Sequence, residues 1–380
     1  MSVMVGPSFA AWGAQHPGGF GGNITVVDKV PPDMLHLVGP HWYQFPPLDP
    51  LWHGIIGVVC IIMCVVAFIG NAMVLYIFTG TKALRTPSNL LVINLAFSDF
   101  CGIVCGAPIM IINCYYETWI LGPFMCDMYG LAGGICGCGS IYTMTTIAME
   151  RYNVIVKGLS AKPLTTKGAL CRIFIVWTLS TFWGIVPVLG WSRYVPEGNM
   201  SSCGTDYLNA DWLSKSYILV YAVLAYFVPL ITIIYSYWFI VKAVAAHEKS
   251  MREQAKKMNV TSLRSSEASQ TNAECKLAKI ALVTITLWFC AWTPYLITNA
   301  IGIFQLSTLS PLGTVWSALC AKASTVYNPI IYGISHPKYR QVLKLKFPSL
   351  VCGGVETTND TQSTVSGVTN VNSTEEKETA

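Results

Sequence analysis

Charged residues are scarce in this chain of 380 residues. They make up 11% of the sequence, while 53% of the residues are hydrophobic and the mean hydropathy is positive. A soluble domain of this length carries about twice that charged fraction. The scarcity excludes a soluble globular protein, and a net charge of only +5 gives no basis for nucleic-acid binding. The composition predicts a polytopic membrane protein.

The chain also lacks internal repeats, a cluster of metal-ligating residues, a phosphate-binding loop and a hydrolytic triad. Transporters typically show repeats or several ionisable residues within the membrane. These absences argue against a transporter and against a metal-dependent or hydrolytic enzyme, and we expect no metal site and no enzymatic activity.

The hydrophobic residues gather in seven segments, each long enough to cross a hydrocarbon core of ~30 Å as a helix. These segments are 53–79, 88–112, 123–150, 170–190, 216–242, 276–303 and 312–334. We therefore predict an all-α fold, a seven-transmembrane helix bundle over residues 53–334. A terminal segment (1–52) precedes it, a short amphipathic helix on the membrane surface (335–350) follows it, and the Ser/Thr-rich tail (351–380) is disordered.

The basic residues predict the orientation of the bundle. Only Lys29, Arg193 and Lys215 lie on the side of the N-terminus, Lys322 lies within a span, and all other basic residues lie on the opposite side. The positive-inside rule places the N-terminus outside the cell and the C-terminus in the cytosol. Residues 1–50 contain no basic segment followed by an apolar run, so we expect no cleavable signal peptide.

Most of the 14 cysteines lie inside the spans, but two differ by their place at the predicted outer end. Cys126 opens the third span, and Cys203 lies in the loop between the fourth and fifth spans. Outside the cell such a pair can form a disulfide, which would pull the loop onto the bundle. Two free thiols, or a bond that uses Cys114, are the alternatives.

Lys322 is the only formal charge in the apolar stretch 316–334. A lysine at the centre of a membrane helix costs about 2.5 to 3.5 kcal/mol on insertion scales, so it is rarely kept without a use. Its amine can snorkel, pair with a buried acid, or condense with an aldehyde, because a low dielectric disfavours the protonated amine and leaves it nucleophilic.

Short motifs follow one another in order along the seven spans. They are Gly70-Asn71, Leu95-Ala96-Phe97-Ser98-Asp99, Glu150-Arg151-Tyr152, Trp177, Pro229, Tyr237, Trp292-Thr293-Pro294, and Asn328-Pro329 with Tyr332. With these motifs the chain resembles the rhodopsin-like G-protein-coupled receptors over nearly its whole length. Lys322, seven residues before Pro329, occupies the position at which opsins hold retinal.

Within the opsins, the chain is most similar to the arthropod rhabdomeric visual group, in particular to the insect or crustacean long-wavelength type. The segments that carry this similarity are 247–260, 336–338 and 191–198. The resemblance implies a light-activated receptor in which retinal, as 11-cis-retinal or a 3-hydroxy relative, is bound as a protonated Schiff base on Lys322.

A buried positive charge requires an anion nearby. Vertebrate visual opsins hold a carboxylate three residues beyond the disulfide cysteine of the third span, and here that residue is Tyr129. We therefore expect Glu197 to be the counterion, linked through Tyr129 and Ser202, although a loop carboxylate is usually solvated. A counterion in a loop predicts a bistable pigment whose photoproduct light can reconvert.

The resemblance implies that Trp292 packs on the retinal polyene. We expect Tyr295, one turn away, and the glycines Gly133, Gly134 and Gly137 to line the same pocket. Helix packing alone would also account for an aromatic stripe and for glycines on a helix.

The resemblance also identifies residues of an activation switch. Arg151 is expected to pair with Glu150 and Glu274 and so to hold two helices in one of two states, although charges at the membrane surface can simply snorkel. The remaining residues of this expected switch are a polar network of Asp99, Asn71 and Asn328 beside Pro329, and the tyrosines Tyr237 and Tyr332.

The implied partners are a Gq-type heterotrimeric G protein, a receptor kinase and arrestin, and the implied location is the rhabdomere membrane. The basic helix after the seventh span is expected to lie on membrane lipid. Asn23 is a glycosylation site by its sequon, and Cys352 is a candidate for palmitoylation. The alternatives are a retinal photoisomerase and a receptor of the same class that binds no retinal.

Overall fold

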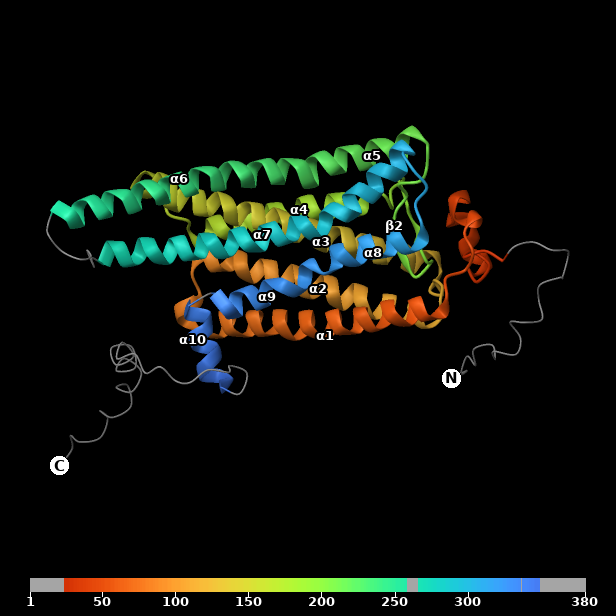
Figure 1. Ribbon diagram of the computed structural model, residues 1–380, viewed down its shortest axis with the longest axis horizontal. Helices are drawn as coiled ribbons and strands as arrows, with labels where there is room; N and C mark the ends of the chain where they lie inside the picture. Colours follow the sequence, from red (N-terminus) through yellow and green to blue (C-terminus); the bar gives the residue numbers. More distant parts are fainter. Residues whose placement is uncertain (1–23, 258–265, 336, 349–380) are drawn as a thin grey trace, which may run out of the picture. The chain divides into compact units, whose positions relative to one another are not determined.

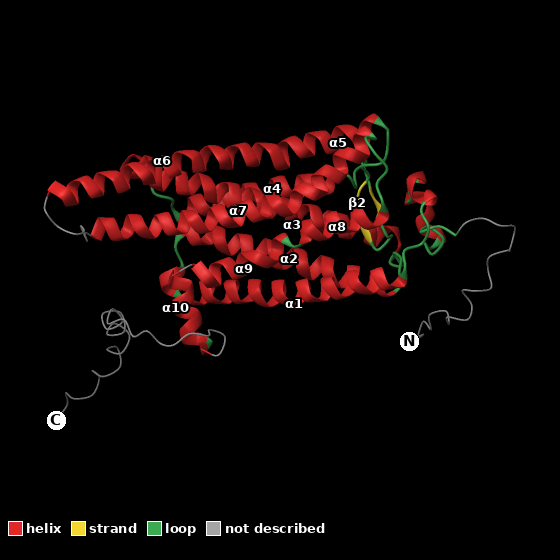
Figure 2. Cartoon of the chain, viewed as in Figure 1, coloured by secondary structure: helices red, strands yellow, loops and turns green. Residues whose placement is uncertain are grey.

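The computed structural model describes residues 24–257, 266–335 and 337–348. Nearly all of the described chain is helical, as Figures 1 and 2 show, which confirms the all-α prediction. The helices are α1 (Pro50–Gly80), α2 (Pro87–Tyr115), α3 (Gly122–Tyr152), α4 (Thr166–Ile185), α5 (Trp212–Ala222), α6 (Val228–Lys257), α7 (Ser266–Phe304), α8 (Pro311–Lys322), α9 (Ser324–Ser335) and α10 (Pro337–Lys346). The chain divides into two compact units at Arg340, and all of the membrane passes lie in the first unit.

Several helices begin at a side chain that satisfies the first free backbone N–H groups. Asp49 caps α1, Thr165 caps α4, and Asp211 caps α5 by accepting from the N–H of Ser214 at 2.6 Å. Thr86 and Ser310 cap α2 and α8, both of which have proline in the first turn. Each cap of this kind stabilises a helix by about 1 kcal/mol, so the sequence sets where the passes begin.

Helix α3 lies at the centre of the bundle and packs against α2, α4, α6 and α7. The core cluster around it includes Leu95, Met144, Tyr237 and Trp288. Large apolar side chains on α1 are exposed instead, which suits a lipid-facing surface. Within the described residues, six helical stretches are long and apolar enough to cross a membrane.

The fifth pass is α5 continued by a π-helical turn (Val223–Phe227) and then by α6. Pro229 follows that turn and has no N–H to donate to a preceding carbonyl. The hydroxyl of Tyr142 on α3 donates to the carbonyl of Leu224 at 3.3 Å. The wider turn is thereby tied to the central helix. Helix α6 runs on to Lys257, beyond the end of the fifth span that the sequence predicted at residue 242.

The seventh pass differs from the single span predicted for 312–334, because it is divided into α8 and α9 at Ala323. Lys322 is therefore the last residue of a helix. Pro329 in α9 cannot donate to the carbonyl of Thr325, and Asn71 of α1 donates to that carbonyl instead, at 2.9 Å. A side chain of one pass thus completes the backbone hydrogen bonding of another.

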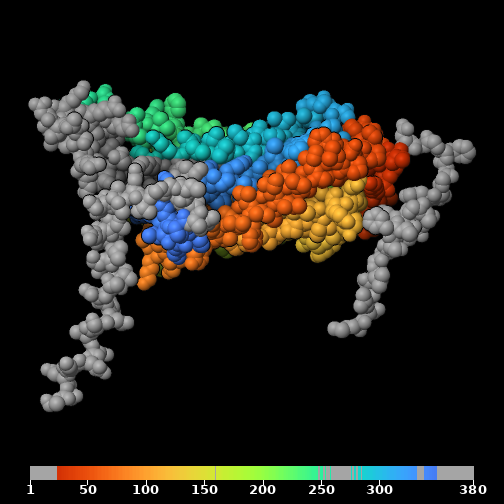
Figure 3. Space-filling view, turned by 60° about the horizontal axis from the view of Figure 1, so that its bottom comes forward, coloured from red at the N-terminus to blue at the C-terminus, as the bar shows by residue number. Residues whose placement is uncertain are grey.

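One end of the bundle carries a β-hairpin of β1 (Tyr194–Glu197) and β2 (Ser202–Thr205), seen in yellow in Figure 2. We call this end the outer end, because the basic residues predict it to be extracellular. The N-terminal residues 26–42 pack on it through the buried side chains of Met34 and Trp42. In the space-filling view these red residues close the outer end beside α1 (Figure 3). The hairpin was not predicted from the sequence.

Candidate functional site: a lysine in an apolar cavity

Lys322 lines a cavity of about 210 Å³ inside the bundle. The walls come from α1, α2, α3, the fifth pass, α7, α8, α9 and the hairpin, and most of the lining side chains are apolar. The amine of Lys322 lies 5.4 Å from the ring centre of Tyr129 on α3. In such apolar surroundings, an amine can react with an apolar ligand while little water is present to compete for the same site.

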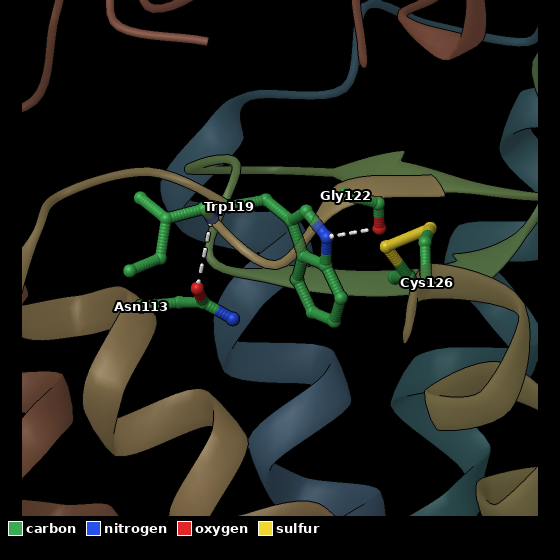
Figure 4. The surroundings of a disulfide bond; sticks show 6 residues. Asn113, Trp119, Gly122 and Cys126 are labelled. Atoms are coloured by element: carbon green, nitrogen blue, oxygen red, sulfur yellow. Dashed lines mark hydrogen bonds between the residues drawn. A yellow bond between two sulfur atoms is a disulfide. The ribbon is translucent and has the colours of Figure 1, made fainter. Parts of the chain in front are cut away.

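The disulfide between Cys126 and Cys203 is present, which confirms the predicted pairing. It joins the start of α3 to β2, so the hairpin lies over the cavity. Around it, Trp119 Nε1 donates to the carbonyl of Gly122 at 3.0 Å, and Asn113 Oδ1 accepts from the N–H of Ile120 at 3.1 Å (Figure 4). The loop that precedes α3 is thereby held in place as a support for the disulfide.

The hairpin can lie close to α3 because Gly130 carries no side chain. A Cβ at Gly130 would lie 2.2 Å from the ring of Tyr194, so any other residue would displace β1. The hydroxyl of Tyr194 donates to the carbonyl of Gly184 at the end of α4, at 2.9 Å. The hairpin, which forms a lid over the cavity, therefore contacts α3 and α4 through Tyr194 in addition to its disulfide.

Glu197 at the end of β1 is 4% exposed and lines the cavity. Burial raises the pKa of its carboxyl group to about 7, against the smaller opposing effect of the positive charge on Lys322. Its Oε2 has no hydrogen-bond partner within the described residues. The carboxylate that the sequence singled out therefore lies inside the protein, and the charge of Lys322 acts on it.

The carboxylate of Glu197 occupies the space above Gly204 of the opposite strand. A Cβ at Gly204 would lie 2.8 Å from each carboxylate oxygen. The hydroxyl of Tyr207, just beyond β2, lies near the same carboxylate. Neither Gly204 nor Tyr207 was singled out from the sequence, since only the folded hairpin brings them to Glu197.

Ser202 is paired with Glu197 across the hairpin. Its hydroxyl is buried and, among the described residues, has no hydrogen-bond partner. The hydroxyl of Tyr129 donates to the sulfur of Met110 at 3.9 Å. The predicted link from Glu197 through Ser202 and Tyr129 to the amine therefore stays a prediction.

The turn of the hairpin fits between α1 and α8. Gly198 has φ +63°, and a Cβ there would lie 3.0 Å from the carbonyl of Pro311. Asn199 is fully buried, and its side-chain nitrogen lies 3.3 Å from Nδ1 of His53 on α1. The segment Asn199-Met200-Ser201 has the pattern of a glycosylation sequon, but its asparagine is inaccessible in the folded chain.

The aromatic and glycine residues predicted for the pocket all line the cavity. The rings of Trp292 and Tyr295 lie 6.3 Å apart at 84°. A Cβ at Gly137 would meet the Trp292 ring at 2.9 Å, and one at Gly134 would meet the Tyr194 hydroxyl at 3.4 Å. Gly133 differs, since nothing lies within 4 Å of its Cβ position.

Trp292 is connected to the break in the seventh pass. Its Nε1 donates to the hydroxyl of Ser324 at 3.1 Å, and the hydroxyl of Thr325 donates to the carbonyl of Lys322 at 3.0 Å. Ser324 and Thr325 were not predicted as site residues. Their hydroxyl groups, two and three residues after Lys322, were a sequence signal that could have identified them. Only the helix break, however, brings these hydroxyls to Trp292 and to the Lys322 carbonyl.

Of the polar network predicted around Asp99, the pairing with Asn328 is present. Asn328 Nδ2 donates to Asp99 Oδ2 at 2.5 Å, and the carboxylate is 1% exposed. Ser140 of α3, which the sequence did not identify, donates to Asp99 Oδ1 at 2.6 Å. The side-chain nitrogen of Asn71 donates instead to the backbone carbonyls of Ala67 and Thr325.

Glu150 makes a contact that the sequence did not predict. Arg172 of α4 donates through Nη1 to Glu150 Oε2 at 2.7 Å, and Glu150 is buried. Arg151 is also buried. The side chain of Glu274, its predicted partner, lies outside the described residues, so that pairing stays a prediction.

Tyr237 is buried in the core cluster beside α3 and α7. Its hydroxyl has no hydrogen-bond partner among the described residues. The side chain of Tyr332 lies outside the described residues, as do Asn23 and Cys352. Their predicted roles are therefore not tested by the geometry.

Residues 70–332 match the family described as 7 transmembrane receptor (rhodopsin family). A protein named "Rhodopsin" from Cataglyphis bombycina is 64% identical over 97% of this chain and 98% of its own length. One named "Rhodopsin, long-wavelength" from Apis mellifera is 61% identical over 99% of each chain. The crystal structure of squid rhodopsin superposes with a TM-score of 0.80 at 37% identity, covering 86% of this chain and 94% of that one.

Proposed function

Because the chain belongs to the rhodopsin family of seven-transmembrane receptors, and within it to the arthropod visual opsins, we propose that Lys322 is the residue that binds retinal. The protein is a light-activated G-protein-coupled receptor of the visual-pigment class. The observation that carries the proposal for Lys322 is its position in an apolar cavity that a buried carboxylate, Glu197, also lines.

The residues of the cavity fit an extended apolar aldehyde. The Cβ position of Gly133 is open, so that part of the α3 wall leaves room for a ligand. Aromatic side chains of the fifth pass and α7 line the same cavity. Retinal supplies light absorption and a change of shape on isomerisation, and we propose that it is linked to Lys322 as a protonated Schiff base, in the 11-cis form or as a 3-hydroxy relative.

Glu197 is proposed as the counterion. A positive charge on Lys322 within this cavity is stabilised by an anion, and Glu197 is the buried carboxylate on the cavity lid. The positive charge in turn favours the ionised form of Glu197. Because Glu197 belongs to a hairpin and not to α3, we propose a bistable pigment whose photoproduct keeps its visible absorption.

The transmission of the signal is proposed to begin at Trp292. Its ring forms part of the cavity wall, and its Nε1 is bonded to Ser324 just beyond the helix break. A change of shape within the cavity would displace this ring and, through Pro294, the inner half of α7. We propose that a set of residues in the bundle changes its contacts between the inactive and the active state. These residues are Asn71, Asp99, Glu150, Arg151, Tyr237, Glu274, Asn328, Pro329 and Tyr332.

Coupling to a heterotrimeric G protein follows from the family. A Gq-type protein is the proposed partner, with a receptor kinase and arrestin acting afterwards on the tail. The protein is a multi-pass membrane protein, and we propose an extracellular N-terminus, a cytosolic C-terminus and a place in the rhabdomere membrane. Glycosylation at Asn23 and palmitoylation at Cys352 belong to the same proposal, and so does the absence of enzymatic activity.

Absorption spectra before and after illumination test the proposal. The expressed protein is incubated with 11-cis-retinal beside Lys322→Ala and, as a control lysine outside the cavity, Lys215→Ala. We expect a visible band in the wild type and in Lys215→Ala but not in Lys322→Ala, and we expect it to persist after light. No band in a folded wild-type protein would contradict retinal binding and leave a receptor for another ligand.

A nucleotide-exchange assay in the light separates the receptor from the retinal photoisomerase. Light-dependent exchange on a Gq-type protein, and much less on other classes, is the expected result. Catalytic turnover of added all-trans-retinal without nucleotide exchange would favour the photoisomerase instead.

A further inference from the structure

The π-helical turn of the fifth pass places Tyr226 against α7. The turn spans Val223–Phe227, and a π turn holds one residue more than an α turn, which rotates the side chains that follow. The Tyr226 ring lies 5.1 Å from the Phe289 ring of α7 at 85°, an edge-to-face arrangement. Tyr226 also lines the cavity of Lys322. One side chain thus touches both the ligand cavity and α7.

The hydroxyl of Tyr226 is bonded to α7. It lies 2.7 Å from Oγ1 of Thr293, and that Oγ1 donates its single hydrogen to the carbonyl of Phe289 at 2.6 Å. A hydroxyl group has one hydrogen to donate. Tyr226 is therefore the donor and Thr293 the acceptor.

This bond lies at the kink of α7. Thr293 precedes Pro294, which has no N–H for the i−4 carbonyl and weakens the helix there. The rings of Trp288 and Trp292 are stacked, 5.1 Å apart at 21°, on the same segment of α7. The indole N–H of Trp288 is buried and unpartnered within the described residues. Within the described residues, the bond from Tyr226 joins the fifth pass to α7 at this height.

We infer that Tyr226 and Thr293 form a positioning pair that holds α7 against the fifth pass in the inactive receptor. The inference rests on the proposed function. The pair acts where a displaced Trp292 would begin to move α7, so the bond must break or lengthen as the inner half of α7 moves outward. Loss of the bond removes stabilisation from the inactive state alone.

The test measures nucleotide exchange in the dark. Tyr226→Phe and Thr293→Val each remove the bond from a different helix and keep most of the side-chain volume. We expect each to raise the dark exchange rate about fivefold, the effect of one hydrogen bond of ordinary strength, with the visible band kept. The double variant is expected to show no further rise, because both changes remove the same bond.

Three control variants are matched to this pair. Thr293→Ser keeps the hydroxyl and is expected to match the wild type. Thr286→Val changes another threonine of α7 that donates to its i−4 carbonyl, at 2.8 Å, and Tyr142→Phe removes a hydroxyl that ties the π turn to α3 instead of α7. Neither is expected to raise the dark rate.

A second readout needs no retinal. Cys275, half-buried near the start of α7, is labelled with a water-soluble maleimide in the retinal-free protein, and its labelling is expected to be faster in Tyr226→Phe and Thr293→Val. Dark rates and labelling equal to the wild type, or a double variant whose effect is the product of the two single effects, would overturn the inference. If the wild type itself forms no visible band, the proposed function fails with it, whereas a normal wild type with unchanged variants rejects this pair alone.

Discussion

Glu197 and Gly204 face each other across the hairpin so closely that a Cβ on Gly204 would lie 2.8 Å from both carboxylate oxygens. The glycine is thus part of the carboxylate site. It lets the charged group turn inward above the cavity, and the disulfide at the neighbouring Cys203 holds the strand that carries it.

Gly204→Ala is therefore expected to displace the Glu197 carboxylate and to weaken its interaction with Lys322. We expect a lower yield of pigment with 11-cis-retinal and a visible band that is lost at a lower alkaline pH than in the wild type. Gly39→Ala, where nothing lies within 4 Å of the Cβ position, is the matched control. An unchanged pH titration of Gly204→Ala would show that the carboxylate does not need this space.

The stability of the retinal-free protein is expected to fall as the pH rises from about 4.5 to about 7. The pKa of Glu197 is raised by burial from 4.5 to about 7. Between these pH values the Glu197 carboxyl group is ionised in the unfolded chain but still protonated in the folded one. Each pKa unit corresponds to about 1.4 kcal/mol, so the loss amounts to up to ~3 kcal/mol. Thermal unfolding in detergent at a series of pH values measures it.

Glu197→Gln cannot ionise and is the control for this pH dependence. We expect its unfolding temperature to change less over the same range and to exceed that of the wild type near pH 8. Equal slopes for the two proteins would mean that another group causes the dependence.

Arg172→Gln is expected to destabilise the receptor, because Glu150 is left buried without its charged donor from α4. We expect a loss of about 1 to 3 kcal/mol, seen as a lower unfolding temperature, and a raised exchange rate in the dark. Lys167→Gln, an exposed basic residue of the same helix, serves as the control.

The double variant Glu150→Gln with Arg172→Gln should recover part of this loss, because a buried pair is harmed most when one partner remains. A double variant that is less stable than Arg172→Gln alone would contradict a direct interaction of the two side chains.

Gly70→Ala is expected to separate α1 from α9. A Cβ at Gly70 would lie 2.8 Å from two carbons of the Pro329 ring, whereas one at Gly54 of the same helix meets nothing within 4 Å. Overpacking of this kind costs about 1 to 3 kcal/mol, while Gly54→Ala should stabilise α1 slightly through its higher helix propensity. Comparison of the two unfolding temperatures checks the prediction, and equal temperatures would contradict it.

Most of the fold could be predicted from the sequence because each pass is specified locally. A run of apolar residues as long as the membrane is thick forms a helix wherever it occurs, and caps such as Asp49 and Thr165 set its start. The seventh pass was predicted only as one span. Its interruption at Ala323 is accompanied by hydrogen bonds from Thr325 and from Trp292 of α7, which the hydropathy of the segment does not reveal.

The sequence predicted the site residues that belong to a recognisable motif. It missed those whose role depends on a neighbour in space. Lys322, Glu197 and the disulfide cysteines stand at recognisable positions of a known pattern. Arg172, Gly204 and Tyr226 have no such pattern. Their partners Glu150, Glu197 and Thr293 lie 22, 7 and 67 residues away along the chain, respectively. For Arg172 and Tyr226 the partner also lies on another helix.

The sequence by itself determined the class of this protein, because hydropathy, the basic residues and the ordered motifs are properties of the chain that folding does not alter. Only the tertiary structure decided the surroundings of each functional group. The burial of Glu197 above Gly204, the pairing of Glu150 with Arg172 and the bond from Tyr226 to Thr293 all arise between segments that touch only after the helices have packed. The energy of a charge or a hydrogen bond depends on that packing, since it is set by the distance to the partner and by the exclusion of water.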